Sequence, residues 1–276
     1  MKIIFFGSSS YVIPILETLK NNFELSLVIT TEEKKGAVIT YCQKNKIELI
    51  SAKSLKEPKI KDLISKAKTT LAVLADFGLI IPEDILSAFP KGIINLHPSL
   101  LPKYRGPTPV QTAIKNGDQE TGITIIKLDK EVDHGEILEQ ETEKITNTDT
   151  AETLYKRLFE KGAKILPKVL DKFLKDELKL TTQNHNNATF TQPLTRRDGE
   201  INLHLNEESK NLKEKIRAYF PWPGVWFKTK LNKTEKIIKL LPGDKLQVEG
   251  KKPMTYKDFL NGYSEAREIL KLFTTN

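Results

Sequence analysis

The chain has 276 residues, of which 38% are hydrophobic and 29% charged, and its mean hydropathy is −0.38. This composition is typical of a folded globular protein with about two domains, and it excludes a disordered or fibrous chain. The single cysteine, Cys42, excludes an internal disulfide framework and a multi-cysteine zinc site. The apolar runs are far shorter than the ~20 residues of a membrane-spanning helix, and the first one ends at Gly7, so we expect a cytoplasmic protein.

Charge is distributed unevenly along the chain. The sequence holds 44 basic and 36 acidic residues, a net charge of +8. Residues 188–276 contribute 17 basic and 11 acidic residues, a net of +6, which leaves +2 for the first 187 residues. A basic C-terminal third favours a polyanionic partner, although a general enrichment of lysine on the surface explains the same numbers.

Apolar runs alternate with amphipathic segments over the first 128 residues. The runs predict buried strands, and apolar residues at helical spacing predict helices between them. We expect strands at 2–6, 25–30, 48–51, 70–75, 92–96 and 122–128, and helices at 11–20, 38–46, 60–67, 82–89 and 110–115. This alternation predicts βαβ units and a doubly wound, mostly parallel, Rossmann-like sheet.

The chain changes character after residue 128. An extended segment is expected at 137–145, and residues 150–178 predict a long amphipathic helix or a pair broken at Pro167. Beyond them we expect a helix at 209–218 and strands at 225–230, 236–241 and 245–248. The polar, Asn-rich stretch at 180–187 predicts a linker. The predicted organisation is a first domain at 1–179, a linker at 180–190 and a β-rich domain at 191–276.

Common cofactor motifs are absent from the sequence. Gly7 is followed by three serines and not by the Gly-x-Gly-x-x-Gly pattern of dinucleotide sites, and there is no Walker loop. The four histidines, His97, His134, His185 and His204, lack the spacing of a metal site. The sequence therefore does not indicate a dinucleotide, ATP or a metal.

Polar residues end the strand expected at 92–96. Asn95 and His97 are two residues apart, so their side chains point to the same face of the sheet. An amide donor and an imidazole together can stabilise an oxyanion and move a proton. Asp133 follows the next strand and can approach His97 to stabilise its protonated form. Taken singly, each of these residues is more often part of a strand end or a turn.

The stretch around these residues is similar to a known family. Residues 95–106, Asn-Leu-His-Pro-Ser-Leu-Leu-Pro-Lys-Tyr-Arg-Gly, resemble the signature of the folate-dependent formyltransferases. Residues 122–124 and 132–137 resemble the second motif of that family. Residues 4–7, 76–82, 99–102 and 217–224 are most similar to the members that act on methionyl-tRNA, and residues 252–262 resemble the end of those proteins. The likeness covers nearly the whole chain.

The resemblance implies a formyltransferase fold at 1–179 and an OB-like, tRNA-binding domain at 191–276. It implies transfer of a formyl group from 10-formyltetrahydrofolate to the α-amine of methionyl initiator tRNA in translation initiation, without a metal. Asn95 would donate to the oxyanion, and His97, held protonated by Asp133, would stabilise charge and help to move the proton. The residues expected at the folate are Phe77, Gly78, Leu79, Ile80, Ser99, Leu100, Leu101 and Pro102. We also expect a monomer with no membrane partner.

Two regions depart from the family pattern. Residues 31–36 stand where the family usually has a longer basic loop, and residues 228–240 look short for a five-stranded OB barrel. Both departures concern expected tRNA contacts, so two alternatives stay open. One is a sugar N-formyltransferase acting on an amino sugar nucleotide, and the other is a non-catalytic RNA-binding protein.

Overall fold

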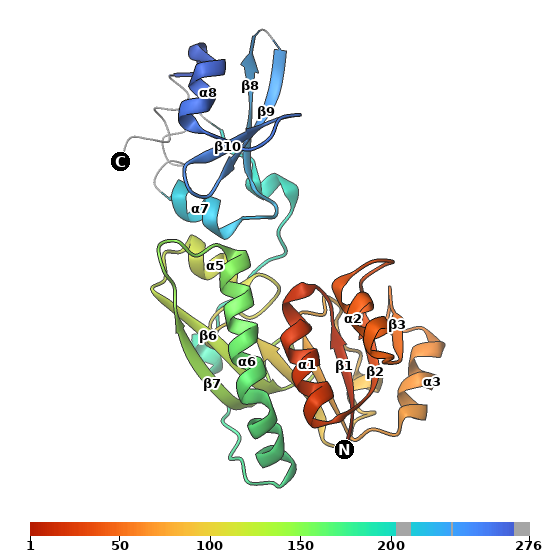
Figure 1. Ribbon diagram of the computed structural model, residues 1–276. Helices are drawn as coiled ribbons and strands as arrows, with labels where there is room; N and C mark the ends of the chain where they lie inside the picture. Colours follow the sequence, from red (N-terminus) through yellow and green to blue (C-terminus); the bar gives the residue numbers. More distant parts are fainter. Residues whose placement is uncertain (203–210, 233, 268–276) are drawn as a thin grey trace. The chain divides into compact units, whose positions relative to one another are not determined.

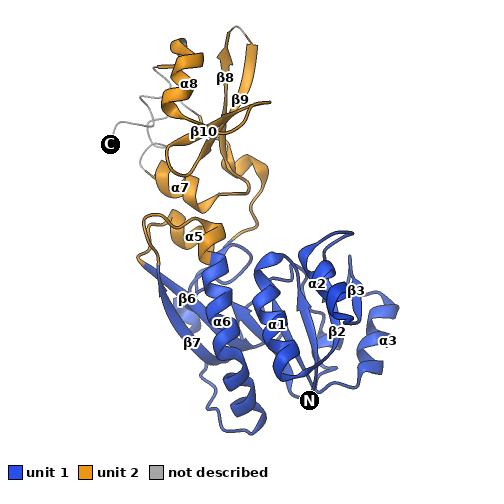
Figure 2. Cartoon of the chain, viewed as in Figure 1, with its two compact units in different colours: residues 1–109, 120–144, 155–191 blue, residues 110–119, 145–154, 192–276 orange. Residues whose placement is uncertain are grey.

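A computed structural model of the chain describes residues 1–202, 211–232 and 234–267 (Figure 1). His204 and the first two residues of the helix expected at 209–218 lie outside these ranges. The chain forms two compact units (Figure 2): unit 1 comprises residues 1–109, 120–144 and 155–191, and unit 2 comprises residues 110–119, 145–154 and 192–276. In the described part of the chain, no helix is both long and apolar enough to cross a membrane.

Unit 1 is built on a seven-stranded sheet with the order β3-β2-β1-β4-β5-β6-β7. Neighbouring strands from β3 to β5 are parallel, whereas β6 and β7 are antiparallel additions at one edge. The strands are β1 (Lys2–Gly7), β2 (Glu24–Thr30), β3 (Leu49–Ser51), β4 (Leu71–Ala75), β5 (Gly92–His97), β6 (Glu120–Lys127) and β7 (Ile137–Lys144). The predicted doubly wound, mostly parallel sheet is confirmed.

Helices connect and cover these strands: α1 (Ile13–Asn22), α2 (Ala37–Asn45), α3 (Pro58–Ala67), α4 (Glu83–Leu86) and α6 (Ala151–Leu174). Helix α5 (Pro109–Lys115) follows β5 in the chain and, apart from Pro109, belongs to unit 2. Helix α4 is shorter than expected and ends at Leu86, before the buried Phe89 and Pro90. Helix α6 runs without a break through Pro167, so of the two predicted alternatives the long helix is confirmed and the broken pair is wrong. Its apolar face, including Leu158, Leu166 and Leu170, is fully buried and holds the helix across the proline.

Alternating residues of the buried strands supply two apolar faces. One face includes Ile4, Phe6 and Ile93 and packs with Ile60 and Ile64 of α3. On the other face, a Cβ at Gly162 of α6 would lie 2.9 Å from the Leu96 side chain. Because real Cβ atoms essentially never approach so closely, glycine lets α6 lie directly on β5 and β6. Both faces of the central strands are therefore covered, as continuous apolar runs predict.

Residues 180–191 run along unit 1. Thr181 pairs with Ile137 of β7, and Phe190 pairs with Arg105. The backbone N–H of Thr191 donates to the Arg105 carbonyl at 2.8 Å. This segment was expected to be mostly linker, and it contributes buried side chains, including Gln183, to unit 1. The domain ranges themselves stay a prediction.

Unit 2 contains an antiparallel sheet with the order β11-β10-β9-β8. Its elements are α7 (Leu212–Ala218), β8 (Val225–Leu231), β9 (Thr234–Leu241), β10 (Lys245–Val248), β11 (Met254–Thr255) and α8 (Tyr256–Gly262). The three strands expected from the sequence are present, and β11 adds a short fourth. The sheet also carries exposed lysines, among them Lys228 and Lys230 of β8 and Lys245 of β10.

Candidate active site

The polar residues singled out by the sequence come together at the end of β5 in unit 1. All six residues of β5 are buried, and Asn95 and His97 are only 5% and 4% exposed. Asn95 lies beside Leu74 of the parallel strand β4, so it sits at the edge where the loop after β4 begins. Ligands in open α/β sheets bind at this carboxyl edge.

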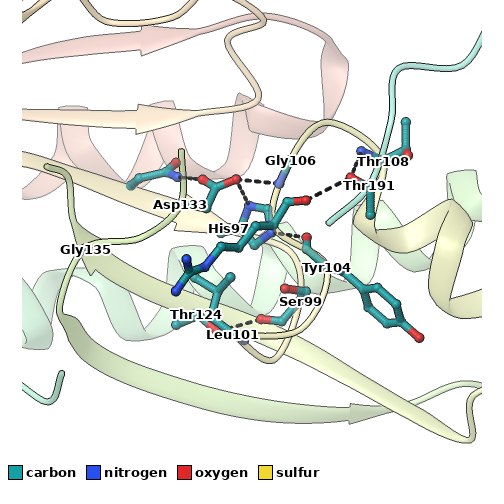
Figure 3. Close-up of polar contacts among 12 residues, drawn as sticks. His97, Ser99, Leu101, Tyr104, Gly106, Thr108, Thr124, Asp133, Gly135 and Thr191 are labelled. Carbon is teal, nitrogen blue, oxygen red and sulfur yellow. Dashed lines mark hydrogen bonds and ion pairs between the residues drawn. The ribbon is translucent and has the colours of Figure 1, made fainter. Parts of the chain in front are cut away.

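Asp133 lies in the turn between β6 and β7, and its carboxylate contacts both Asn95 and His97. Figure 3 shows the side chain of Asp133 beside that of His97. Asn95 Nδ2 donates to Asp133 Oδ1 at 3.2 Å, and His97 Nδ1 is 3.5 Å from Asp133 Oδ2. The backbone N–H of Gly106 donates to Asp133 Oδ2 at 2.8 Å. Three donor groups therefore converge on one carboxylate whose side chain is 12% exposed.

The contacts of His97 suit the protonated ring. His97 Nε2 is 2.9 Å from the Tyr104 carbonyl, which only accepts, so this nitrogen carries a proton. Nδ1 faces a carboxylate, which also only accepts when it is ionised. An imidazolium satisfies both neighbours, whereas a neutral ring leaves a lone pair facing one of them. The structure thus brings together the three residues that the sequence predicted as catalytic.

Gly106 is a residue that the sequence analysis did not assign to the site. Its φ of +106° lies in the region that favours glycine. A Cβ at Gly106 would also lie 2.9 Å from Thr191 O and Thr191 Oγ1. Both observations explain why glycine presents the main-chain donor to Asp133. A main-chain donor cannot be recognised from its residue type. The position of Gly106 at the end of the 95–106 motif was the signal that could have indicated a role at the site.

The loop after β5 is fixed by internal hydrogen bonds. Thr124 Oγ1 of β6 donates to Ser99 O at 2.6 Å and accepts from the Leu101 N–H at 3.2 Å. Gln140 Nε2 of β7 donates to Leu101 O at 3.1 Å and to Thr124 Oγ1 at 2.9 Å. Ser99 Oγ itself donates to Lys103 O at 2.6 Å. Thr124 and Gln140 are therefore supports of this loop that sequence reasoning missed.

The residues expected at the folate differ in exposure. Phe77 is buried in the core, where its ring packs edge-on against Phe6. Ile80 in the same loop is 80% exposed, and Gly78 has a φ of +80° with open space around it. Of the second group, Ser99 and Leu101 are buried, whereas Leu100 and Pro102 are half-buried. Contact of these eight residues with folate stays a prediction.

A formyl transferase family model matches residues 1–170, a range that includes Asp133 and the three residues that contact its carboxylate. The chain belongs to this formyl transferase family. Two curated relatives are both named methionyl-tRNA formyltransferase. The protein from Finegoldia magna is 30% identical to this chain, and the alignment covers 98% of this chain and 99% of that protein. The protein from Ehrlichia chaffeensis is 33% identical to this chain, and the alignment covers 96% of this chain and 98% of that protein.

Solved structures of formyl transferases share the fold. An N-formyltransferase from Helicobacter canadensis, solved in complex with folinic acid and dTDP-3-aminofucose, superposes with a TM-score of 0.62. The two sequences are 22% identical, and the superposition covers 92% of this chain and 98% of that protein. At this identity the likeness supports the fold alone.

Proposed function

We propose that this formyl transferase moves the formyl group of 10-formyltetrahydrofolate to the α-amine of methionyl initiator tRNA. The observation that carries the proposal is the match to two methionyl-tRNA formyltransferases over at least 96% of the chain. That match extends through the basic residues 188–276 as well as the family motifs. The reaction provides formylmethionyl-tRNA for translation initiation, and we place it in the cytoplasm with a monomeric enzyme.

The reaction needs one new bond and one proton transfer. The neutral amine attacks the formyl carbon, which gives a tetrahedral carbon with a negative oxygen. The bond to the folate nitrogen then breaks, the amine nitrogen loses a proton, and the leaving nitrogen gains one. The products are formylmethionyl-tRNA and tetrahydrofolate, so atoms and charge balance without an oxidant or a metal.

Asn95 is suited to stabilise the tetrahedral oxygen. One hydrogen of its amide is held by Asp133 Oδ1, which fixes the orientation of the second. A fixed donor in a buried site stabilises a developing charge more than water does. Loss of one such donor typically lowers the rate about 100- to 1,000-fold. We therefore propose that Asn95→Ala lowers turnover by about that factor.

Asp133 and His97 are suited to handle the proton. Asp133 is the more accessible of the two, and its carboxylate can accept the proton that the amine loses. His97 contacts Asp133 and the Tyr104 carbonyl, so in this arrangement it acts on the reaction through Asp133. A protonated His97 balances the negative charge of the carboxylate and of the tetrahedral oxygen.

The folate is proposed to lie along residues 77–80 and 99–102, at the same sheet edge. An apolar slot with backbone hydrogen-bonding groups suits a pteridine ring. The exposed side chain of Ile80 and the open space at Gly78 leave room there for a ligand. The folinic acid complex of the Helicobacter canadensis protein supports a folate donor for this fold.

Unit 2 is proposed to hold the tRNA. Its exposed lysines on β8 and β10 can contact phosphates, and such contacts give affinity that falls with salt and depends little on sequence. The charge difference between residues 188–276 and the remainder, +6 against +2, supports this assignment.

The test offers the purified protein 10-formyltetrahydrofolate with a labelled formyl group and one acceptor at a time. The acceptors are methionyl initiator tRNA, the same tRNA without methionine, and an amino sugar nucleotide. We expect label only on methionyl-tRNA, released as formylmethionine after deacylation, and labelling about 100- to 1,000-fold slower with the Asn95→Ala protein. Labelling of the sugar nucleotide alone overturns the proposal, and labelling of no acceptor leaves the non-catalytic alternative.

A further inference from the structure

The turn that carries Asp133 needs support from outside itself. Asp133 has a φ of +48°, in the left-handed region, which L residues other than glycine adopt at a cost. A Cβ at the nearby Gly135 would come within 1.8 Å of the Lys127 carbonyl, so the turn lies tightly against the end of β6. A small shift of this turn would move the Asp133 carboxylate away from Asn95 and His97.

The side chain of Gln183 holds the main chain of this turn. Gln183 Nε2 donates to Asp133 O at 2.9 Å and to Gly135 O at 2.8 Å. Gln183 is only 4% exposed. Both amide hydrogens are therefore bonded to carbonyl oxygens on either side of His134, and little water competes for them.

Arg105 fixes the other end of the Gln183 amide. Gln183 Oε1 accepts from Arg105 Nε at 3.2 Å and from Arg105 Nη2 at 2.7 Å. A guanidinium only donates and the two carbonyls only accept, so the amide has one possible orientation. Arg105 is 3% exposed, and its backbone pairs with residues 189–191. The amide is thus clamped between a buried cation and the turn.

The same stretch of chain also reaches the carboxylate. Gly106, next to Arg105, donates its N–H to Asp133 Oδ2 at 2.8 Å. Asp133 is consequently held twice, at its side chain by Gly106 and at its main-chain carbonyl by Gln183. Figure 3 shows the contacts of the carboxylate with Gly106 and His97, and Gly135 on the continuing turn.

We propose that Gln183 is a positioning residue that keeps the Asp133 carboxylate in its working place. The proposal rests on the proposed formyl transfer for its kinetic effect, and on contacts of the free protein for its structural effect. Misplacement by about 1 Å can cost on the order of 100-fold in rate. Gln183 touches no reacting atom, so its loss should lower kcat and leave the KM for the folate donor nearly unchanged.

Gln183→Glu is the sharpest variant. It keeps the size of the side chain and gives Arg105 an acceptor, but it removes both donors to the turn. Gln183→Met removes all four hydrogen bonds at similar volume and serves where the acid variant fails to fold. Asn184→Asp, an amide-to-acid change at the next, exposed position, is the matched control. We expect kcat to fall about 10- to 100-fold in Gln183→Glu and less than about threefold in the control.

A double-variant cycle separates positioning from a general effect on the fold. Where Asp133 is already asparagine, placing that side chain matters little, so Gln183→Glu should lower the remaining rate less than about threefold. Equal losses in both backgrounds would assign Gln183 a merely structural role and overturn the proposal.

Hydrogen exchange of the free, full-length protein gives a second readout that needs no acceptor. In Gln183→Glu the Gly106 amide, which bonds the Asp133 carboxylate, should exchange at least about tenfold faster. The Leu101 amide, bonded to Thr124, should be unchanged. Wild-type kcat and wild-type Gly106 exchange in the variant would overturn the inference. Faster exchange in a protein that formylates no tRNA would overturn the proposed function but keep this contact assignment.

Discussion

Asp133→Asn is the substitution whose consequences follow most directly from the contacts at the site. The carboxylate has two accepting oxygens, which face Asn95 Nδ2, the Gly106 N–H and His97 Nδ1. An asparagine has one accepting oxygen and an NH2 group that only donates. Whichever way its amide is turned, at least one of the three donors faces another donor.

The expected magnitudes are set by burial and by the lost charge. The Asp133 side chain is 12% exposed, so a donor left without a partner cannot turn fully to water. An unsatisfied buried donor costs about 1–3 kcal/mol, and we expect the free energy of unfolding to fall within that range. Removing a group that accepts a proton in the transition state costs about 100- to 10,000-fold in rate. Because tenfold in rate corresponds to about 1.4 kcal/mol, this loss is about 3–5 kcal/mol in activation free energy, at or above the upper end of the expected loss of stability.

The assay compares single-turnover formylation with urea unfolding of the same preparations at pH 7. Glu131→Gln, an exposed acid-to-amide change on the same turn, is the control, and we expect its rate within about threefold of wild type. Turnover of Asp133→Asn above one tenth of wild type, in a folded protein, would refute the proton-acceptor assignment. An unchanged free energy of unfolding would refute the argument from opposed donors.

Three further predictions concern other parts of the chain. Burial, and then the charge of Glu32, raise the pKa of the Cys42 thiol to about 11. Ellman's reagent, which reacts with the thiolate, should therefore label Cys42 at pH 8 only after unfolding, and rapid labelling of the native protein would contradict this. Glu32 Oε2 accepts from two backbone N–H groups in the first turn of α2, so Glu32→Ala should lower the free energy of unfolding in urea by about 1 kcal/mol, and an unchanged transition would contradict the cap. Replacing Lys228 and Lys230 with glutamine should reduce the slope of log tRNA affinity against log salt by about 1.4 to 1.8, and an unchanged slope would remove β8 from the tRNA contacts.

Much of unit 1 could be predicted because its signals are local. The buried strands are continuous apolar runs between glycine-rich or polar turns, and this pattern by itself indicates a buried strand. Asn95 and His97 could be paired from the two-residue period of a strand alone. The sequence left open whether the helix breaks at Pro167. Proline removes only one hydrogen bond of the helix, whereas the buried apolar face of α6 extends over its whole length and keeps the helix continuous.

The supports of the site could not be predicted in the same way. Gln183 lies 78 residues from Arg105 and 50 from Asp133, in a polar, Asn-rich stretch whose composition is typical of a linker. The turn offers only its main-chain carbonyls to Gln183, and main-chain groups are the same in every sequence. What distinguishes Gln183 from the neighbouring asparagines is its burial between a guanidinium and two carbonyls. Because an amide can both donate and accept, it can join a cation to a strained turn and leave the negative charge of Asp133 available for the proposed proton transfer.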